Sequence, residues 1–376
     1  MSALGERSFV AKQVFSWIHK RGVFDPSSMT NLSATLRTKL AETGLGPVAE
    51  IAHVHRSADG TRKVVLKLAD GATIETVLLP GVSGPNAQNE ANADAAAADD
   101  DDDEEEDTTT NTAKIRVTQC ISTQVGCAMG CVFCASGVAG LQRHLGPEEI
   151  VAQVLIGRSL CEQDERLRNV VFMGMGEPLH NYDSTARALR LLTHLDGIGL
   201  STRRVTVSTS GLVPEIERLG QEFQGQVSLA ISLHATDDES RSALMPINRK
   251  YPLAELLAAL KAYPLPPRRR ITIEYTLVSG KNDTHQEAVR LSKLLRGIPV
   301  KINLIPMNPI EASSLGPPDM KRVLAFQQVL VDAGYSCFIR RRRGDDVSAA
   351  CGQLALLGRK PKVKGFRPTD SLKAGS

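Results

Sequence analysis

The chain has 376 residues, of which 42% are hydrophobic and 4% aromatic, and its formal net charge is +3. It contains no run of about 18 apolar residues and begins with no apolar signal segment, so the sequence predicts neither a membrane span nor a secreted protein. Seven cysteines, an odd number, favour metal or redox chemistry over a disulfide framework and predict a cytoplasmic location.

The charge is unevenly distributed along the chain. Residues 99–107 are nine consecutive acids, and without them the net charge rises from +3 to +12. The rest of the chain is therefore distinctly basic, which indicates a polyanionic partner or a surface that is basic for solubility alone.

Residues 7–45 are predicted to be helical. A stripe at helical spacing begins at Phe9 and includes Val14 and Trp17, and cap residues at 30–33 precede a second amphipathic segment at 34–43. This segment is either a small helical packing domain or a helical RNA-docking module.

Residues 51–79 are predicted to form a three-stranded antiparallel meander. Asp59-Gly60 and Asp70-Gly71 are strong hairpin turns between its strands. Glu75 lies in the third strand, where taken alone it would be a solvent-facing residue. Residues 81–113 cannot bury apolar surface and are predicted to be a disordered acidic insertion, either a solvated loop or a transient mimic of RNA.

A cysteine-rich stretch at 120–134 follows. Cys127, Cys131 and Cys134 have the spacing Cys-x3-Cys-x2-Cys, which lets a short loop turn three thiolates towards one centre. A closed zinc site needs four ligands, and no fourth Cys or His follows at finger spacing. An iron–sulfur cube held by three thiolates keeps one iron open for a substrate or cofactor. Gly126 and Gly130 permit the tight backbone that such a loop needs.

Beyond the cysteines, predicted strands alternate with predicted helices, which is typical of parallel βαβ units. We therefore expect an α/β fold in which six strands form a partial (β/α)6 barrel. The strands are expected at 117–122, 169–173, 204–208, 227–232, 270–278 and 300–305. The helices are expected at 147–160, 184–192, 214–219, 253–262, 285–295 and 321–333.

Polar residues fall where these strands end, which is the rim that carries the chemistry of such barrels. Each has an ordinary structural interpretation, such as a helix cap for Ser208, a strand-end histidine for His234 and a turn residue for Asn308. Their common rim favours a single site. The stretches concerned are 173–178, 208–211, 232–234 and 306–309.

The C-terminal region adds four arginines, 340–343, which are either an anion-binding patch or a solvated run. Cys351 follows between small residues. It is either an inert buried thiol or a reactive thiol on a flexible loop.

These motifs resemble those of a known family. The cysteine spacing, with Phe133 before the last cysteine, is similar to the signature of the radical S-adenosylmethionine (SAM) superfamily, whose open iron chelates SAM. From Gln13 to Leu354 the chain resembles the RlmN/Cfr-type radical SAM methyltransferases, which methylate adenosine in 23S ribosomal RNA and, in one branch, transfer RNA. The motifs that carry this resemblance lie at 124–127, 173–178, 232–234, 302–306, 343–346 and 349–354.

Two motifs, Gly176-Glu177-Pro178 and Arg343-Gly344-Asp345-Asp346, look like the RlmN branch, which acts on carbon 2 of adenine, rather than the branch that acts on carbon 8. The expected layout is then an N-terminal RNA-docking domain, an antiparallel strand extension, the acidic insertion, a catalytic partial barrel and a basic flexible tail. These segments are expected at 1–50, 51–80, 81–113, 114–356 and 357–376.

The resemblance also implies roles for individual residues. Cys127, Cys131 and Cys134 would hold a [4Fe–4S] cluster. Cys351 would carry the methyl group, Cys120 would resolve the adduct with RNA through a disulfide, and Glu75 would accept a proton. The insertion lies between Glu75 and Cys120 and breaks the spacing of the family there. The residues that would bind SAM are Gly176, Glu177, Ser208, Ser232, Leu233, His234 and Asn308.

Carbon 2 of adenine is electron-poor and cannot displace a methyl group from SAM, whereas a cysteine thiolate can. Two SAM molecules would be used per turnover, one as methyl donor and one as the source of a radical. The implied partners are 23S rRNA and tRNA, with an unstacked target base, and an electron donor such as flavodoxin; the protein is expected to be a monomer. The alternatives are methylation at carbon 8 and a non-catalytic iron–sulfur sensor that binds RNA.

Overall fold

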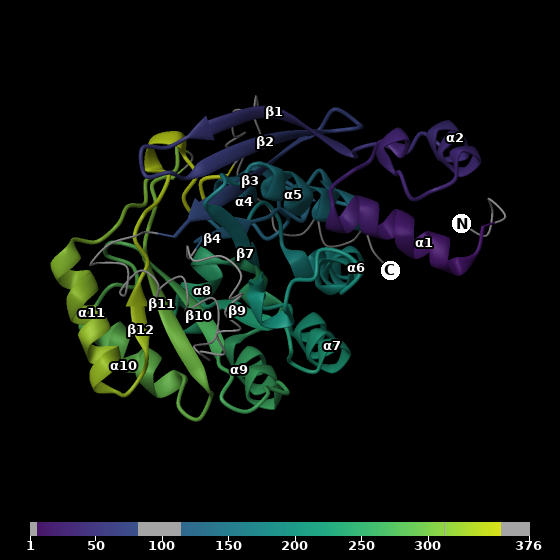
Figure 1. Ribbon diagram of the computed structural model, residues 1–376. Coiled ribbons are helices and arrows are strands. Elements are labelled where there is room, and N and C mark those ends of the chain that lie inside the picture. Colours follow the sequence, from purple (N-terminus) through teal and green to yellow (C-terminus); the bar gives the residue numbers. More distant parts are fainter. Residues whose placement is uncertain (1–5, 82–113, 312, 355–376) are drawn as a thin grey trace.

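The computed structural model describes residues 6–81, 114–311 and 313–354 (Figure 1). Helix α1 (Ser8–Phe15) continues into a π-helical turn, Ser16–Lys20, and α2 (Ala34–Glu42) begins after Ser33, whose hydroxyl accepts a hydrogen bond from the Leu36 N–H (3.2 Å). The predicted helices are confirmed, although Phe9 is exposed and lies outside the buried stripe. These elements enclose a small core of their own, formed by Val10, Val14, Trp17, Met29, Leu32, Leu36 and Leu40.

A ten-stranded sheet follows, in the order β1-β2-β3-β4-β7-β8-β9-β10-β11-β12. The predicted meander is confirmed: β1 (Ala49–Arg56), β2 (Arg62–Leu68) and β3 (Thr73–Pro80) pair antiparallel, and β3 pairs antiparallel with β4. From β4 onwards all neighbours are parallel. These strands are β4 (Ile115–Cys120), β7 (Glu165–Phe172), β8 (Val205–Thr209), β9 (Ser228–Ser232), β10 (Ile271–Leu277), β11 (Val300–Pro306) and β12 (Cys337–Ile339).

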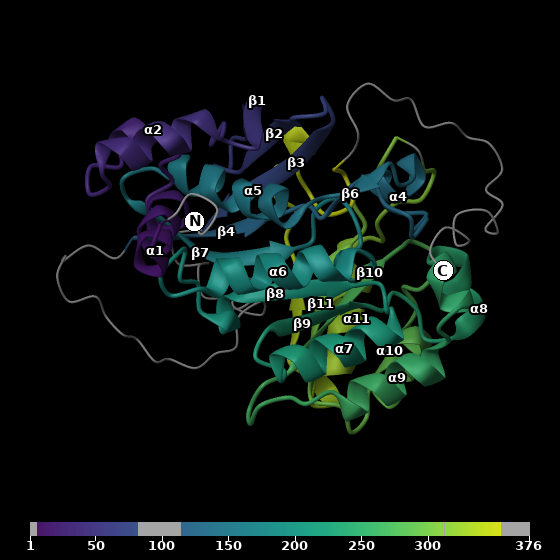
Figure 2. The same cartoon turned by 90° about the vertical axis from the view of Figure 1, so that its right-hand side faces the viewer.

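Helices cover the outer face of the parallel strands, and Figure 2 shows α5, α6, α7 and α9 in a row on that face. The predicted partial barrel is confirmed, and the short strand β12, which the sequence did not predict, extends it by one strand. The covering helices are α5 (Pro147–Ser159), α6 (Tyr182–Thr193), α7 (Val213–Phe223), α9 (Leu253–Ala262), α10 (His285–Leu294) and α11 (Met320–Asp332).

Smaller elements occupy the loops between these helices and strands. A two-stranded sheet, β5 (Gln124–Val125) with β6 (Arg143–His144), flanks the cysteine loop. The short helices are α4 (Ala135–Ala139) and α8 (Asp238–Leu244). Single 3-10 turns lie at Pro26–Ser28, Pro178–Asn181, Thr202–Arg204, Pro246–Arg249 and Asp345–Val347.

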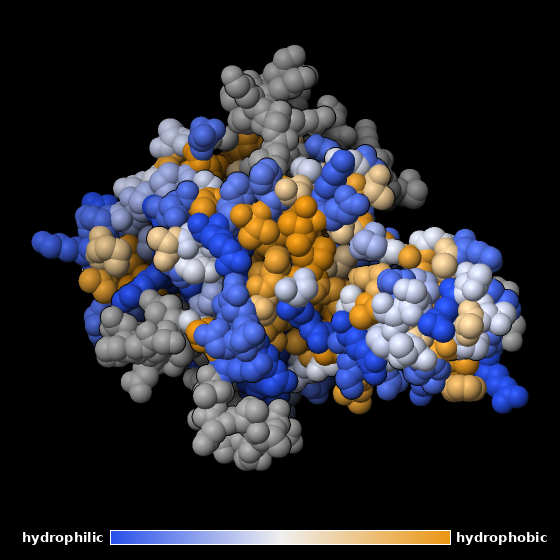
Figure 3. Space-filling view, turned by 45° about the horizontal axis from the view of Figure 1, so that its top comes forward, coloured by the Kyte–Doolittle hydropathy of each residue, from blue (hydrophilic) through white to orange (hydrophobic). Residues whose placement is uncertain are grey.

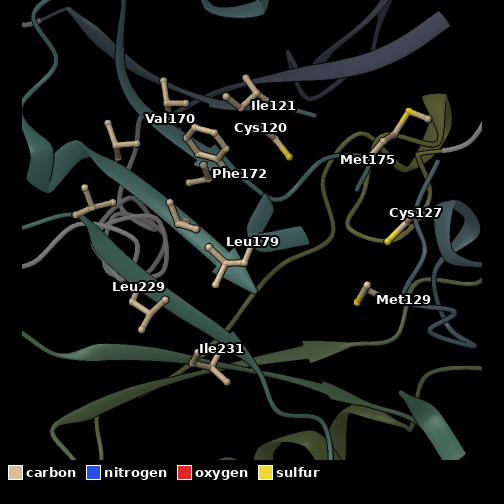
Figure 4. Close-up of a cluster of buried hydrophobic side chains, with 14 of the residues drawn as sticks. Cys120, Ile121, Cys127, Met129, Val170, Phe172, Met175, Leu179, Leu229 and Ile231 are labelled. Carbon is tan, nitrogen blue, oxygen red and sulfur yellow. The ribbon is translucent and has the colours of Figure 1, made fainter. Parts of the chain in front are cut away.

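One hydrophobic core extends from the meander to the last strand, and it includes Cys120 and Cys127 (Figure 4). The meander is joined to the barrel by the fully buried Arg62, which donates to both carboxylate oxygens of Glu165 (2.9 and 2.7 Å). On the outside, Figure 3 shows hydrophobic side chains gathered in the middle of one face, beside the N-terminal helices.

The expectation that Glu75 faces solvent is wrong, because only 3% of it is exposed. Glu75 pairs with Val65 on β2, and on its other edge its carbonyl accepts a hydrogen bond from the hydroxyl of Ser122, just beyond β4 (2.6 Å). Its carboxylate is paired with Lys63 on β2 (3.2 Å).

Two predicted segments fall outside what the structure describes: the acidic insertion from residue 82 onwards and the basic tail at 357–376. Within residues 6–81, 114–311 and 313–354, no helix is both long and apolar enough to cross a bilayer.

Candidate active site

The carboxyl ends of the parallel strands surround one cavity, as the positions of the polar residues predicted. The loops from β4, β7, β8, β9 and β11 all contribute to its wall, together with the C-terminal loop. The predicted site residues that line it are Cys127, Cys131, Cys134, Gly176, Glu177, Ser208, Ser232, His234, Asn308 and Cys351. Glu75, Cys120 and Leu233 are absent from its lining.

The cysteine loop is held tightly at its base. Gly126 has a φ of 80°, and a Cβ there would lie 1.9 Å from the carbonyl oxygen of Gly140. That carbonyl also accepts a hydrogen bond from the Cys127 N–H (3.2 Å). Farther along, a Cβ on Gly137 would lie 2.9 Å from the backbone nitrogen of Cys131. Glycines are therefore needed where the loop packs against its own backbone.

Burial raises the pKa of all three loop cysteines, and the nearby thiolates of the others raise those of Cys127 and Cys131 further. Two features oppose this effect: backbone N–H groups of Gly137 and Ser136 lower the pKa of Cys134, and the Arg241 guanidinium lowers that of Cys131. Three thiols placed close together lose their protons reluctantly, because the resulting thiolates repel one another. They become thiolates when cations bind between them.

Three thiolates on one loop suit a cubane cluster better than a closed zinc site, which needs four ligands. In the described part of the chain, no group of three or more His, Cys, Asp or Glu side chains is placed to hold a single metal ion. Cys127, Cys131 and Cys134 would each bind a different iron of such a cluster, and the fourth iron would then have no protein ligand.

Arg241, which the sequence did not single out, is fully buried under this loop. Its guanidinium donates to the carbonyl oxygens of Leu233 (3.0 Å), Ser210 (2.7 Å) and Ser232 (3.0 Å), and to Asn248 Oδ1 (2.9 Å). Burial lowers its pKa to about 10. It therefore ties together the ends of β8 and β9 and places a positive charge beside the cysteines.

Glu177, in the loop after β7, has a buried carboxylate close enough to Cys127 and Cys131 to raise the pKa of both thiols. Its oxygens accept hydrogen bonds from the backbone N–H groups of Leu179 (3.1 Å) and Ser210 (2.7 Å). Burial raises its pKa, and the Ser210 N–H opposes that shift. The side chains of Thr209 and Ser210 also line the cavity, and both lower the pKa of Glu177 through their hydroxyls. This wall of the cavity is therefore polar.

His234 is held as a neutral hydrogen-bond donor. Its φ is 60°, in the left-handed region, and its Nδ1 accepts from the Thr276 N–H (2.9 Å). Burial, with a contribution from Arg241, lowers its pKa to about 3. Because Nδ1 accepts, the ring hydrogen is on Nε2. The neighbouring Leu233 is fully buried, and its N–H donates to the Glu274 carbonyl (3.0 Å), so its side chain lies in the core.

Glu274 lines the cavity although the sequence did not single it out, and beside it lies Arg340, the first of the four arginines noted in the sequence. Glu274 Oε1 accepts from Asn303 Nδ2 (3.0 Å) and lies 3.9 Å from the Arg340 guanidinium, whereas Oε2 is buried without a partner. Because a carboxylate in the middle of a hydrophobic strand is costly to bury, its position in β10 was a signal in the sequence that could have identified Glu274 as a functional residue.

Cys351 is exposed and lies where the cavity meets a second groove, which the four arginines 340–343 and apolar residues line. The interpretation of Cys351 as an inert buried thiol is therefore wrong. Its loop is attached to α4 through the Ala135 N–H, which donates to the Gly352 carbonyl (2.8 Å). Asn308 Nδ2 donates to the Cys351 carbonyl (3.0 Å), and Arg342 Nε donates to Asn308 Oδ1 (2.9 Å). The arginine run thus holds the loop as well as lining the groove.

Cys120 ends β4 beside Cys351, and its side chain is drawn in Figure 4. Burial and the charge of Cys351 raise its pKa to about 12, while Arg340 lowers it. Cys120 pairs with Val77 on β3, so Glu75, two residues earlier, faces the same side of the sheet. All seven cysteines are free in the described residues, so no disulfide joins Cys120 to Cys351 here.

A partial parallel barrel with a three-cysteine loop after its first parallel strand, and a cavity between that loop and the strand ends, defines a radical SAM enzyme. Comparison with known proteins agrees. The Radical SAM superfamily matches residues 121–292, and the Ribosomal RNA large subunit methyltransferase N-terminal domain matches residues 1–45.

The chain belongs to the RlmN family of radical SAM RNA methyltransferases. It is 75% identical to a protein of Sorangium cellulosum named Dual-specificity RNA methyltransferase RlmN, over 97% of this chain and 94% of that one. The protein of the same name from Geobacter sulfurreducens is 44% identical over 97% and 89% of the two chains. Among solved structures, a radical SAM methyltransferase from Sphaerobacter thermophilus superposes with a TM-score of 0.80, at 41% identity and 94% coverage of each chain.

Proposed function

We propose that this enzyme methylates carbon 2 of an adenosine in 23S rRNA and in tRNA. The relatives are named as dual-specificity RNA methyltransferases, and the N-terminal match is to a ribosomal RNA methyltransferase domain, which supports both substrates. The motifs at Gly176-Glu177-Pro178 and Arg343–Asp346, which resemble the RlmN branch, support carbon 2 over carbon 8. In this proposal residues 1–50 help to dock the RNA, and the enzyme works as a monomer with an external electron donor such as flavodoxin.

The position of Cys351 carries the proposal. Cys351 lines both the cavity of the cysteine loop and the arginine-lined groove, and it is the cysteine among the predicted site residues that does so. A thiol at this junction can receive a methyl group on one side and meet an RNA base on the other, where guanidinium groups suit the phosphates beside that base.

The cavity is suited to hold a cluster and SAM. Cys127, Cys131 and Cys134 would bind three irons, and the lining from β7, β8, β9 and β11 would bind SAM through Gly176, Glu177, Ser208, Ser232, Leu233, His234 and Asn308. Leu233 could contribute only through its backbone, since its side chain is in the core. When bound, the reduced cluster and SAM supply the radical that activates an unreactive methyl group.

Release of the product is assigned to Cys120. If Cys351 is linked to the base through a methylene carbon, the Cys120 thiolate attacks the Cys351 sulfur, so that an S–S bond forms and the S–C bond breaks. The bonding electron pair goes to the released carbon, which takes up a proton and becomes the methyl group. Glu75 accepts the proton lost from carbon 2 of the base when the link forms, and the single electron lost with that proton returns to the external electron carrier, which supplied one electron for the cleavage of SAM. The disulfide must then be reduced by an external thiol before the next turnover.

Replacing Cys120 tests this step. Cys120→Ala should retain iron and cleave SAM, yet accumulate protein with RNA attached that survives a denaturing gel. The matched control is Cys120→Ala with Cys351→Ala, which should show no attached RNA. Normal turnover of Cys120→Ala would exclude Cys120 as the resolving thiol.

Two measurements separate the alternatives. Mass spectrometry of nucleosides from RNA incubated with the enzyme distinguishes 2-methyladenosine from 8-methyladenosine. A non-catalytic sensor would bind RNA but would not cleave SAM under reducing conditions, so SAM cleavage by the reconstituted enzyme would exclude that interpretation.

A further inference from the structure

A buried glutamine connects the cysteine loop to the acidic motif of the cavity. Gln124 is fully buried in β5, at the start of the loop that carries Cys127. Its Oε1 accepts the backbone N–H of Glu177 (2.8 Å), and its Nε2 lies 3.0 Å from Nδ1 of His144 and 3.1 Å from Nδ1 of His180. Three segments that are far apart in sequence therefore meet on one amide.

The hydrogen bonds determine how this amide is oriented. A backbone N–H can only donate, so the group that faces Glu177 must be the oxygen of Gln124. Its NH2 group then faces the two histidines and has two hydrogens, one for each Nδ1. Both histidines must therefore accept at Nδ1 and have their ring hydrogen on Nε2.

The amide lies directly against the motif that it contacts. Gly176 has a φ of 103°, and a Cβ there would lie 2.6 Å from the Cβ of Gln124. The carboxylate of Glu177 is already held by the N–H groups of Leu179 and Ser210. Gln124 adds a restraint on the backbone N–H of Glu177, from the strand that leads into the cysteine loop.

The surroundings keep the two histidines neutral. Burial lowers the pKa of both, and His144 and Lys250 lower that of His180 further. The rings are in edge contact, with centroids 5.0 Å apart. The charge next to His144 in the chain, Arg143, is paired with Asp70 (2.7 Å) and Glu149 (2.8 Å), and Glu177 directs its oxygens to backbone groups.

We propose that Gln124 is a positioning residue that sets Glu177 relative to the three cysteines, and that His144 and His180, as neutral acceptors, hold its amide in the orientation this requires. The inference rests on the proposed role of Glu177 in binding SAM. It accounts for a polar cluster, made of the buried Gln124, the half-buried His180 and the exposed His144, that the proposed catalytic steps do not use.

The test is the affinity for SAM as a function of pH. Reconstituted protein is measured by equilibrium dialysis between pH 5.5 and 8.5, with iron per chain as a control for the cluster. In the wild type, affinity should fall as the pH falls below the ordinary histidine range, because a protonated Nδ1 cannot accept from Gln124. Gln124→Leu should bind SAM about tenfold more weakly at every pH, since the Glu177 N–H is left without its buried partner.

Gln124→Glu removes the reason for the pH dependence. Its second oxygen requires donors from the histidines, which can donate from Nδ1 either as the other neutral tautomer or when protonated, so the affinity of this variant should not fall as the pH falls. His180→Phe keeps the ring but removes one acceptor, and it should flatten the pH dependence of the wild type. This variant keeps the test open if Gln124→Leu fails to fold.

Several results would overturn the inference. Affinities of Gln124→Leu and His180→Phe equal to the wild type, or the same pH slope in wild type and Gln124→Glu, would each do so. Loss of iron in Gln124→Glu would also do so, because it would place Gln124 in cluster assembly. Failure of the wild type itself to bind SAM would instead refute the role of Glu177.

Discussion

The two sides of the cavity are built differently. On the side of the strand ends, Glu177 and His234 are each 4% exposed and Arg241 is 0% exposed, and hydrogen bonds to backbone groups fix all three. On the other side, Cys351 is exposed on a loop between a 3-10 turn and the last described residues. The first side can hold a cofactor in one geometry, whereas the second can release its thiol.

The two sides of the cavity also differ in the free energy that it costs to break their hydrogen bonds. Removing one partner from a buried, hydrogen-bonded polar group costs about 1–3 kcal/mol, and more when the group is charged. The hydrogen bonds that we find between the Cys351 loop and the rest of the protein run mainly through its backbone carbonyls, which a small local opening can break and remake. A thiol that must act at SAM and then at RNA needs such a loop.

The largest effect should come from removing one of the three cysteines of the loop that faces the cavity. Cys131→Ala removes one of three thiolates, so the protein should lose its cluster and all SAM cleavage. The iron content and visible spectrum of anaerobically reconstituted protein measure this. The same substitution at Cys161, which lies outside the cavity lining, is the matched control and should leave the iron content unchanged. A normal cluster spectrum in Cys131→Ala would refute the assignment of this loop.

A smaller effect is expected at Glu177, where the cavity wall stays but its charge is removed. In Glu177→Gln an NH2 group must face either the Leu179 N–H or the Ser210 N–H, and donor then meets donor. Affinity for SAM should fall about tenfold or more, with iron content retained. The thermal midpoint of this variant should also be lower, because Glu177 is one of the buried, hydrogen-bonded groups on the strand-end side of the cavity. An unchanged midpoint together with normal SAM affinity would contradict it.

The strand-end side of the cavity was largely predictable from the sequence, and the side formed by the Cys351 loop was less so. Glycines, cysteines and polar residues at the ends of hydrophobic runs indicated the barrel rim, because each run had a length and period typical of its element. Strand β12 was not predicted, because a three-residue strand followed by four arginines shows no hydrophobic periodicity. The exposure predicted for Glu75 was wrong because one strand alone does not reveal which face of the sheet is covered, and Glu75 faces the same side as Cys120, which lies in the core.

The contacts between distant segments could not be read from the sequence at all. Arg241 lies in an ordinary amphipathic stretch, and its role under the cysteine loop depends on β8 and β9 ending side by side. Arg342 belongs to a run that suggested phosphate binding. Only the fold shows that this side chain turns inward to Asn308.

The smallest effect is expected at Arg342. This side chain restrains the Cys351 loop, and it makes no described contact with the three cysteines that would hold the cluster. Its Nε orients Asn308, whose Nδ2 holds the Cys351 carbonyl, and another nitrogen pairs with Asp345 (3.0 Å). Arg342→Ala should free the loop and slow methylation about tenfold, equivalent to one lost hydrogen bond of about 1.4 kcal/mol. Iron content and the thermal midpoint should be unchanged.

Arg342→Lys separates orientation from charge. Lysine keeps the positive charge but loses the planar fork that reaches Asn308, so it should not restore the rate if orientation is what Arg342 supplies. The alkylation rate of Cys351 by a neutral thiol reagent reports the loop directly and should rise in both variants, since the loop that carries this thiol opens more often. Restored methylation in Arg342→Lys with an unchanged alkylation rate would mean that Arg342 acts on RNA through its charge alone. The Cys351 loop would then be as rigid as the opposite side of the cavity, and the thiol would have to reach both substrates without moving.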